Sequence, residues 1–303
     1  MTEVRVAGVG LTRFGSHPDR TGRDLFATAA ERAFADADVP RADVARLNYG
    51  NFIGTLAERQ GHQAPLLAEA AGIRAPATRS ASACAAARLP VRGPLRPRRA
   101  GDADVVLAGG MERMTNLETP AVTEGLAMAA DDLFEVHAGV TFPGAYALLA
   151  RAYFEAHGGT RRDLAHVAVK NHANAVPNEY AQFRDPISVR DALDAPPVAD
   201  PLHLYDACPI TDGASAIVLV SASYAADNDI DAPVAVTGAG QGSDRMALAD
   251  RADLTRTPAA VAAAETAYDA AGVEPDDVDL AEVHDCFTIA DVLAVRVVTA
   301  QQS

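Results

Sequence analysis

The stretch ERAFADADVPRADV, from Glu31 to Val44, is the strongest indication of the fold, because a second copy of it follows later in the chain. ETAYDAAGVEPDDV, from Glu265 to Val278, aligns with it without a gap at an offset of 234 residues. Each copy is preceded by a β-branched run that ends in glycine, VRVAGVG at Val4–Gly10 and VAVTGAG at Val234–Gly240. The shared order of strand, loop, helix, acidic turn and strand predicts two homologous halves that form a duplicated α/β fold.

Local patterns within and around the two copies predict the individual elements. Thr21 followed by Asp24 is a capping-box pattern, which predicts a helix that runs to about residue 37. Proline at the first position and Gly272 just past the end predict a helix over 258–271. Short apolar runs predict strands at 4–10, 47–52, 78–83, 104–110, 214–221, 234–240 and 280–283. Helical patterns also cover 63–71, 143–157 and 160–176.

The two copies also predict how the chain divides into domains. We expect an N-terminal half over 1–230, in which residues of about 111–205 form an excursion from the sheet, rich in Pro, Asp and Asn in its loops. The second copy begins near Val234, so 231–303 is expected to be the start of a C-terminal half. The first copy continues for many more residues than the second, and the second half therefore looks incomplete.

Composition narrows the class of protein. The chain has 303 residues, is 49% hydrophobic and carries a net charge of −15, with Lys170 as its only lysine. An acidic surface argues against nucleic acid, which needs a basic footprint, and against anionic membranes. Lys-poor, Asp-rich composition is typical of proteins from salt-loving archaea, but a GC-rich genome also favours Arg over Lys. Both explanations stay open.

Cysteine usage and the N-terminus predict a compartment. The three cysteines, Cys84, Cys208 and Cys286, are odd in number and lack a framework spacing, which favours thiols in a reducing compartment. The first ten residues read as a strand and not as a signal peptide, and no apolar run is long enough to cross a membrane. We therefore expect a cytoplasmic protein.

Five short segments, taken in their order along the chain, carry recognisable sequence motifs. They are SASACAAA at Ser80–Ala87, GGMERM at Gly109–Met114, VAVKNHANAVPNEYAQF at Val167–Phe183, ACPITDGASAIVLVS at Ala207–Ser221 and EVHDCFTIA at Glu282–Ala290. In this order they resemble the nucleophile motif, the glycine turn after the third strand, the loop-domain helix, the strand that closes the first half and a catalytic motif of the thiolase superfamily. The HDCF of the last segment is similar to the sterol-carrier-type and archaeal branch, where other thiolases carry NEAF.

This resemblance covers nearly the whole chain and implies both a fold and a reaction. The superfamily packs two βαβαβαββ halves as a five-layer α-β-α-β-α fold, with a loop domain inserted in the first half. Its members form or cleave 3-ketoacyl-CoA, and acetyl-CoA and acetoacetyl-CoA are the substrates we expect here, in lipid metabolism. Coenzyme A thioesters would be substrates, and no separate cofactor is expected. The resemblance also implies a homodimer or homotetramer.

Cys84 is the candidate nucleophile. It would lie where a strand ends and a helix begins, and helix amides and the helix dipole favour the attacking thiolate there. The thiolate would attack an acyl-CoA thioester and give an acyl-enzyme. The alternative is a small buried cysteine with a packing role; the surrounding motifs favour the nucleophile.

His284 and Cys286 are the other two candidate catalytic residues. The His284 imidazole could hold the thioester oxygen of the second substrate as it becomes an enolate, or it could be a structural histidine at a strand end. The resemblance implies that Cys286 is the thiol that removes a proton from carbon 2 of acetyl-CoA. A metal site at these positions is not expected, because adjacent strand residues point to opposite faces.

Several other polar residues are expected to have structural roles and not catalytic ones. Cys208, before a proline, is expected to be structural. Asn171, His172 and Asn174 lie on a polar helix face and are expected to be solvated or to cap backbone groups.

Two stretches depart from the family pattern. A helix should follow Cys84, but residues 86–98 contain Pro90, Pro94 and Pro97, and each interior proline costs a helix about 3 kcal/mol. Two compensating frameshifts or an altered active-site loop would each give this pattern.

After Val295 the chain reads RVVTAQQS, whereas the family continues to a GHP-type motif whose histidine activates the nucleophile. We therefore expect the chain as written to lack that base and to be unstable or prone to aggregation.

These departures leave competing functions. One is a thiolase with a Cys84 acyl-enzyme. Another is a catalytically inactive remnant or scaffold subunit that binds a partner thiolase, an acyl-CoA synthase or an accessory protein. A lipid binder is ranked last, because the sequence shows no additional lipid-binding domain.

Overall fold

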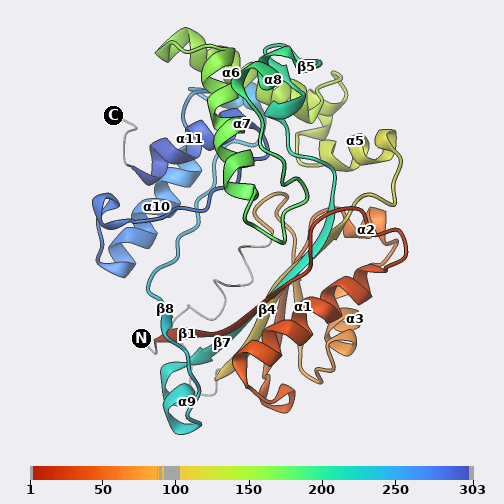
Figure 1. The fold of residues 1–303 in the computed structure, drawn as a ribbon, viewed down its shortest axis with the longest axis vertical. Helices are drawn as coiled ribbons and strands as arrows, with labels where there is room; N and C mark the ends of the chain where they lie inside the picture. The colour runs from red at the N-terminus through yellow and green to blue at the C-terminus, as the bar shows by residue number, and fades with distance from the viewer. Residues whose placement is uncertain (1–2, 87, 89–90, 92–102, 300–303) are drawn as a thin grey trace. The chain divides into compact units, whose positions relative to one another are not determined.

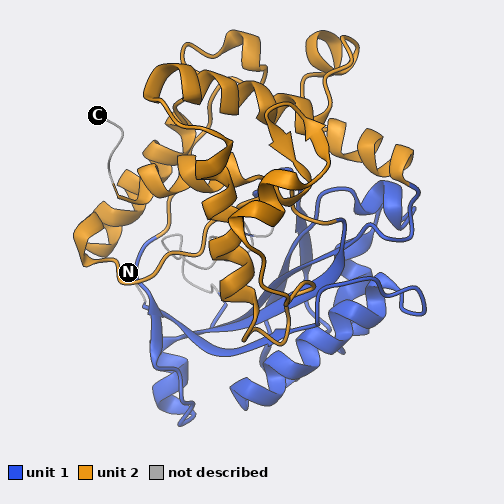
Figure 2. Cartoon of the chain, turned by 45° about the horizontal axis from the view of Figure 1, so that its top comes forward, with its two compact units in different colours: residues 1–118, 210–238 blue, residues 119–209, 239–303 orange. Residues whose placement is uncertain are grey.

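A six-stranded mixed sheet organises the first of two compact units, which comprises residues 1–118 and 210–238 (Figure 2). The computed structural model describes residues 3–86, 88, 91 and 103–299, so the proline-rich stretch predicted at 86–98 lies almost wholly outside the described residues, as does the end of the tail. The strand order is β3-β2-β4-β7-β1-β8. The strands are β1 (Val4–Leu11), β2 (Arg46–Gly50), β3 (Ala77–Ser80), β4 (Val105–Arg113), β7 (Asp212–Ser221) and β8 (Val234–Val236).

The sheet combines parallel and antiparallel pairs of strands. β2 runs parallel to both β3 and β4, whereas β7 is antiparallel to β4 and β1, and β8 is antiparallel to β1. The central strand β4 is buried from Val105 to Met111, which explains why its sequence reads as a continuous apolar run and not as an alternating one. The carboxyl ends of β2, β3 and β4 therefore meet at one edge of the sheet.

Helix α1 (Gly22–Ala37) confirms the predicted capping box and packs on this sheet (Figure 1). The Thr21 backbone N–H donates to the Asp24 carboxylate at 2.9 Å, and the Asp24 N–H donates to the Thr21 hydroxyl at 3.3 Å. These bonds satisfy backbone donors that the first helical turn leaves without partners. The buried face of the helix is rich in alanine, so its backbone can approach the sheet closely. The unit also contains α2 (Gly54–Ala57), α3 (Gln63–Ala70) and α9 (Ala222–Asp227).

The close approach of glycine to helix backbone occurs in both copies of the repeat. A Cβ added at Gly10 would lie 2.1 Å from the backbone oxygen of Ala29 in α1. A Cβ added at Gly240 would lie 1.7 Å from the backbone oxygen of Ala263. Ala263 stands 234 positions after Ala29, so the sequence repeat is also a repeat of structure.

The second unit, residues 119–209 and 239–303, is mainly helical. Its longer elements are α5 (Thr119–Ala127), α6 (Phe142–His157), α7 (Arg161–Ala175), α8 (Val189–Asp194), α10 (Pro258–Ala271) and α11 (Thr288–Val298), with a hairpin of β5 (Pro197–Ala199) and β6 (Leu202–His203). The predicted helix over 258–271 is confirmed, and Gly272 ends it in the left-handed conformation with φ of 68°. The core includes Ala147 and Ala150 of α6, Leu164 of α7, and Ile289 and Leu293 of α11.

Two sequence predictions for the second copy are wrong or too long. No strand forms at 280–283, where Leu280 is 76% exposed. The strand expected over 234–240 covers only Val234–Val236, and it pairs with β1 of the first unit. A strand needs a neighbour for its backbone groups, and within the described ranges no strand pairs with 280–283. The domain boundaries predicted at 230/231 stay a prediction.

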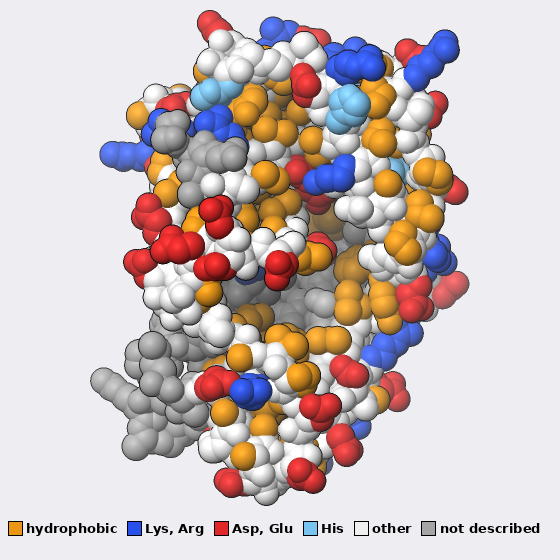
Figure 3. Space-filling model, turned by 60° about the vertical axis from the view of Figure 1, so that its left-hand side comes forward, with side chains coloured by type: hydrophobic (Ala, Val, Ile, Leu, Met, Phe, Trp, Pro, Cys, Tyr) orange, Lys and Arg blue, Asp and Glu red, His pale blue; other side chains and the backbone are white. Residues whose placement is uncertain are grey.

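Acidic side chains are spread widely over the face drawn in Figure 3, in keeping with the net charge of −15. Among the described residues, no helix is both long enough and apolar enough to span a membrane.

Candidate active site

Cys84 lies four residues past the end of β3, in a tight turn of the first unit. Its side chain is exposed, and the residue before it, Ala83, has a φ of 42°. A non-glycine residue in this left-handed region is strained, and such strain is concentrated at functional sites. Backbone bonds from Ala85 to Ser82 and from Ala86 to Ala83 hold the turn. The predicted strand therefore ends earlier than expected, and the thiol is presented by a turn.

A half-buried polar cluster, which no local sequence pattern marks, lies beside the end of β3. The Asn51 backbone N–H donates to the Ser80 carbonyl, and the Asn51 side chain donates to Glu112 at 2.8 Å. The Phe52 N–H donates to the other carboxylate oxygen at 2.7 Å, and Arg79 donates to the Asn51 side-chain oxygen at 3.1 Å. Burial raises the pKa of Glu112 above its ordinary value. The cluster joins the carboxyl ends of β2, β3 and β4, from which the chain continues to Cys84.

His284, Asp285 and Cys286 form the short irregular segment of the second unit that leads into α11, a segment that we call the turn of His284 and Cys286. The His284 side chain is exposed, whereas Cys286 is 7% exposed and belongs to the core. The Cys208 backbone N–H donates to the Cys286 carbonyl at 3.0 Å, and Ala207 forms a β-bridge with Phe287. The two candidate residues therefore share a turn whose backbone is fixed by the segment around Cys208.

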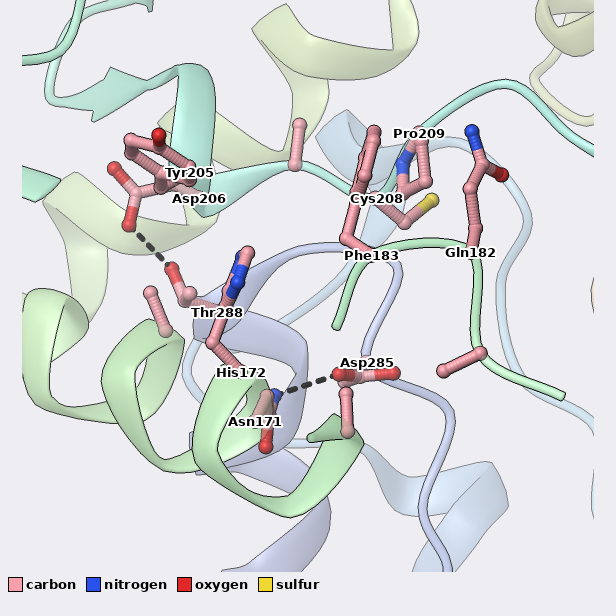
Figure 4. A pocket seen from close by; sticks show the side chains of 14 residues that line it. Asn171, His172, Gln182, Phe183, Tyr205, Asp206, Cys208, Pro209, Asp285 and Thr288 are labelled. Carbon is pink, nitrogen blue, oxygen red and sulfur yellow. Dashed lines mark hydrogen bonds between the residues drawn. The ribbon is translucent and has the colours of Figure 1, made fainter. Parts of the chain in front are cut away.

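A cavity of about 240 Å³ opens beside this turn (Figure 4). Asn171 on α7 donates to the Asp285 carboxylate at 2.6 Å, and Thr288 donates to Asp206 at 2.8 Å. Cys208, which is expected to be structural, also lines the cavity and is exposed. Asn171, expected to be solvated or capping, instead contacts the residue between His284 and Cys286. No local pattern marks this contact, because its partners stand 114 positions apart.

An apolar cavity of about 130 Å³ lies elsewhere in the second unit. Phe142, Tyr146 and Leu149 of α6 line it together with Met246. Glu135 borders it, is 7% exposed and accepts hydrogen bonds from the backbone N–H groups of Asp131 and Leu248. No local sequence pattern marks this cavity, because its walls come from segments about 100 residues apart in the chain.

The three predicted site residues divide between the two units: Cys84 belongs to the first, and His284 and Cys286 belong to the second. Their catalytic roles stay predictions. Within the described ranges, no group of three or more His, Cys, Asp or Glu side chains is arranged to hold a metal ion.

Comparison with known proteins gives the family. The thiolase N-terminal domain matches residues 4–223, and the thiolase C-terminal domain-like family matches residues 240–298. An acetyl-CoA acetyltransferase of Methanothermobacter thermautotrophicus is 42% identical over 98% of this chain and 77% of its own length. Human sterol carrier protein 2 is 26% identical over 97% of this chain, which spans 56% of that protein.

A solved structure confirms the expected α/β, thiolase-like fold. The Ltp2–ChsH2(DUF35) aldolase superposes with a TM-score of 0.82 and 26% identity, covering 98% of this chain and 76% of that one. The family matches cover both units, and the match to human sterol carrier protein 2 extends over nearly the whole of this chain. The chain therefore belongs to the thiolase family of acyltransferases, as a member of the sterol carrier protein 2 type.

Proposed function

We propose that this chain forms or cleaves 3-ketoacyl-CoA through an acyl-enzyme on Cys84, with acetyl-CoA and acetoacetyl-CoA as substrates. The observation that carries the proposal is the 42% identity to an acetyl-CoA acetyltransferase over 98% of the chain. The exposed thiol of Cys84, next to a left-handed Ala83, supports its role as nucleophile.

The first half-reaction transfers an acyl group to the enzyme. The Cys84 thiolate attacks the carbonyl carbon of acetyl-CoA, a new carbon–sulfur bond forms, and the bond to coenzyme A breaks. Coenzyme A leaves as its thiol after it takes up a proton. The exposure of Cys84 supports this step, because a bulky thioester must reach the sulfur.

The second half-reaction makes the new carbon–carbon bond. Cys286 removes a proton from carbon 2 of a second acetyl-CoA, and the His284 imidazole donates a hydrogen bond to the enolate oxygen. The carbanion then attacks the acetyl group on Cys84 and releases acetoacetyl-CoA and the Cys84 thiolate. The shared turn of His284 and Cys286 supports this pairing of roles, since an enolate needs its base and its oxygen donor on the same acetyl group.

Intact-mass spectrometry of the full chain with acetyl-CoA tests the proposal. We expect the wild type to gain one acetyl group, C84A to gain none and C208A to gain it normally. C208A is a matched control because Cys208 is also exposed. Acetylation that persists in C84A would overturn the assignment of the nucleophile.

A second candidate function is a non-catalytic subunit that binds a partner. It is favoured by the Ltp2–ChsH2(DUF35) aldolase, in which a chain similar to this one is named together with a DUF35 protein. Under this alternative a DUF35-type protein would co-purify with the chain, and Cys84 would not become acetylated whether or not that partner is present. A homodimer or homotetramer, tested by light scattering, is the expectation under the first proposal.

A further inference from the structure

The face of α7 that carries Lys170 and Asn171 contacts both the turn of His284 and Cys286 and the helix that follows it. Lys170 Nζ lies 2.8 Å from Asp291 Oδ2 in the first turns of α11. Asn171 Nδ2 donates to Asp285 Oδ2 at 2.6 Å and lies 3.4 Å from Asp291 Oδ2. Two adjacent residues of α7 thus hold two carboxylates that stand on the two sides of Cys286 in the sequence.

The carboxylate of Asp291 is buried, and this burial makes its polar contacts important for stability. Asp291 is 3% exposed, and a buried carboxylate is stable only when it is paired and hydrogen-bonded. The positive end of the α11 dipole and the Lys170 ammonium both stabilise that charge. The chain has 26 Lys and Arg residues, and Lys170 is the only lysine among them. Its compact ammonium group pairs with Asp291, whereas the rest of these side chains carry a guanidinium group.

The opposite side of the turn is held by different residues. Asp206 accepts from Thr288, and the backbone of Cys208 donates to Cys286. These bonds fix the backbone at Cys286 and beyond, whereas the bond from Asn171 reaches Asp285, between the two candidate catalytic residues.

We propose that Lys170 and Asn171 are positioning residues for carbon–carbon bond formation. Through Asp291 and Asp285 they hold the turn in the geometry in which Cys286 removes a proton and His284 holds the enolate oxygen. The inference rests on the proposed function of these two residues. It assigns the pair to the second half-reaction and leaves the acetylation of Cys84 independent of them.

The test separates the two half-reactions in N171A. We expect the exchange of acetyl-CoA carbon 2 protons with deuterium from D2O to fall about tenfold to 100-fold, because small displacements of catalytic groups have effects of that size. Acetylation of Cys84 should keep its wild-type rate. N174A is the matched control, since Asn174 is an exposed asparagine on the same helix, and it should match the wild type in both assays.

D291N provides an independent variant. It removes the buried negative charge, whereas the Lys170 side chain is already half exposed to solvent. We therefore expect the same selective loss of proton exchange, together with a shift in the pH profile of the exchange rate. K170R keeps the positive charge but changes the shape of the side chain, so its exchange rate should lie between those of D291N and the wild type. Unchanged exchange rates and pH profiles in N171A and D291N would overturn the inference.

A further measurement keeps this outcome distinct from a failure of the proposed function. If the wild type neither acetylates nor exchanges protons, the proposed function fails. The rate at which iodoacetamide alkylates Cys286 in the folded protein, measured by peptide mass, then decides the positioning role. A rate in N171A that differs from both the wild type and N174A supports it, and equal rates in all three overturn it.

Discussion

Tyr146 of α6 stacks on Phe287, with ring centroids 4.4 Å apart and ring planes 23° apart. Phe287 directly follows Cys286 and is 5% exposed, so this stack secures one end of the turn to the core of the second unit. Phe142 extends the aromatic group at 5.6 Å from Tyr146. The turn is thus held by apolar packing on one side and by polar contacts from α7 on another.

We predict that Y146A lowers the free energy of unfolding by about 2 kcal/mol, because it removes a half-buried ring and its stacking contact. Y146F is the control, since it keeps the ring and its stack on Phe287. Denaturant unfolding followed by circular dichroism measures both. A Y146A loss no greater than that of Y146F would show that the stack contributes little.

The glycine–helix contacts give a second prediction. G10A would place a methyl group against the backbone oxygen of Ala29, which cannot move without shifting α1. We expect a loss of about 3 kcal/mol in the free energy of unfolding, or an insoluble protein. G61A is the control, because a Cβ there meets open space and should change stability by less than about 0.5 kcal/mol. Equal melting temperatures for G10A and G61A would contradict the close packing of β1 on α1.

Asp24 gives a prediction about pH. Its hydrogen bonds with the backbone and side chain of Thr21 lower its pKa below the ordinary value. A lowered pKa in the folded state means that the carboxylate stabilises the fold above the unfolded pKa of about 3.9. That contribution is lost as the pH falls through the folded value.

D24A should therefore be less stable than the wild type near neutral pH, by about 1 kcal/mol as for other capping residues. The difference should shrink as the pH falls below 4. D19A, which changes an exposed aspartate in the turn before the helix, should show no such trend. Chemical unfolding at a series of pH values measures the difference, and a pH-independent gap would argue against the charged cap.

The assigned roles of His284 and Cys286 predict different defects. C286A should lower carbon 2 proton exchange by about 100-fold or more and still allow acetylation of Cys84. H284A should lower exchange by a similar factor, because it removes the donor to the enolate oxygen. H284N should recover part of the rate, because the asparagine amide can still donate and the NEAF thiolases carry asparagine there. An H284N rate equal to that of H284A would argue against an oxygen-binding role.

Local sequence patterns predicted elements whose stability depends mainly on residues nearby in the chain. The capping box at Thr21 begins α1, and α10 begins and ends where Pro258 and Gly272 predict. β4 was recognised from its continuous apolar run, although it extends to Arg113. The strand expected at 280–283 failed because a strand depends on a partner, and its own residues do not determine whether one is present.

The repeat, the family and the candidate residues Cys84, His284 and Cys286 were all evident from the amino-acid sequence, because ordered motifs are carried by short contiguous segments. The contacts that hold the turn of His284 and Cys286 in place became evident only in the folded structure. The pairing of Lys170 with Asp291 spans 121 positions, and the stack of Tyr146 on Phe287 is similarly remote in the chain. Such contacts depend on how helices pack, and packing depends on the whole core of the unit and not on any local pattern.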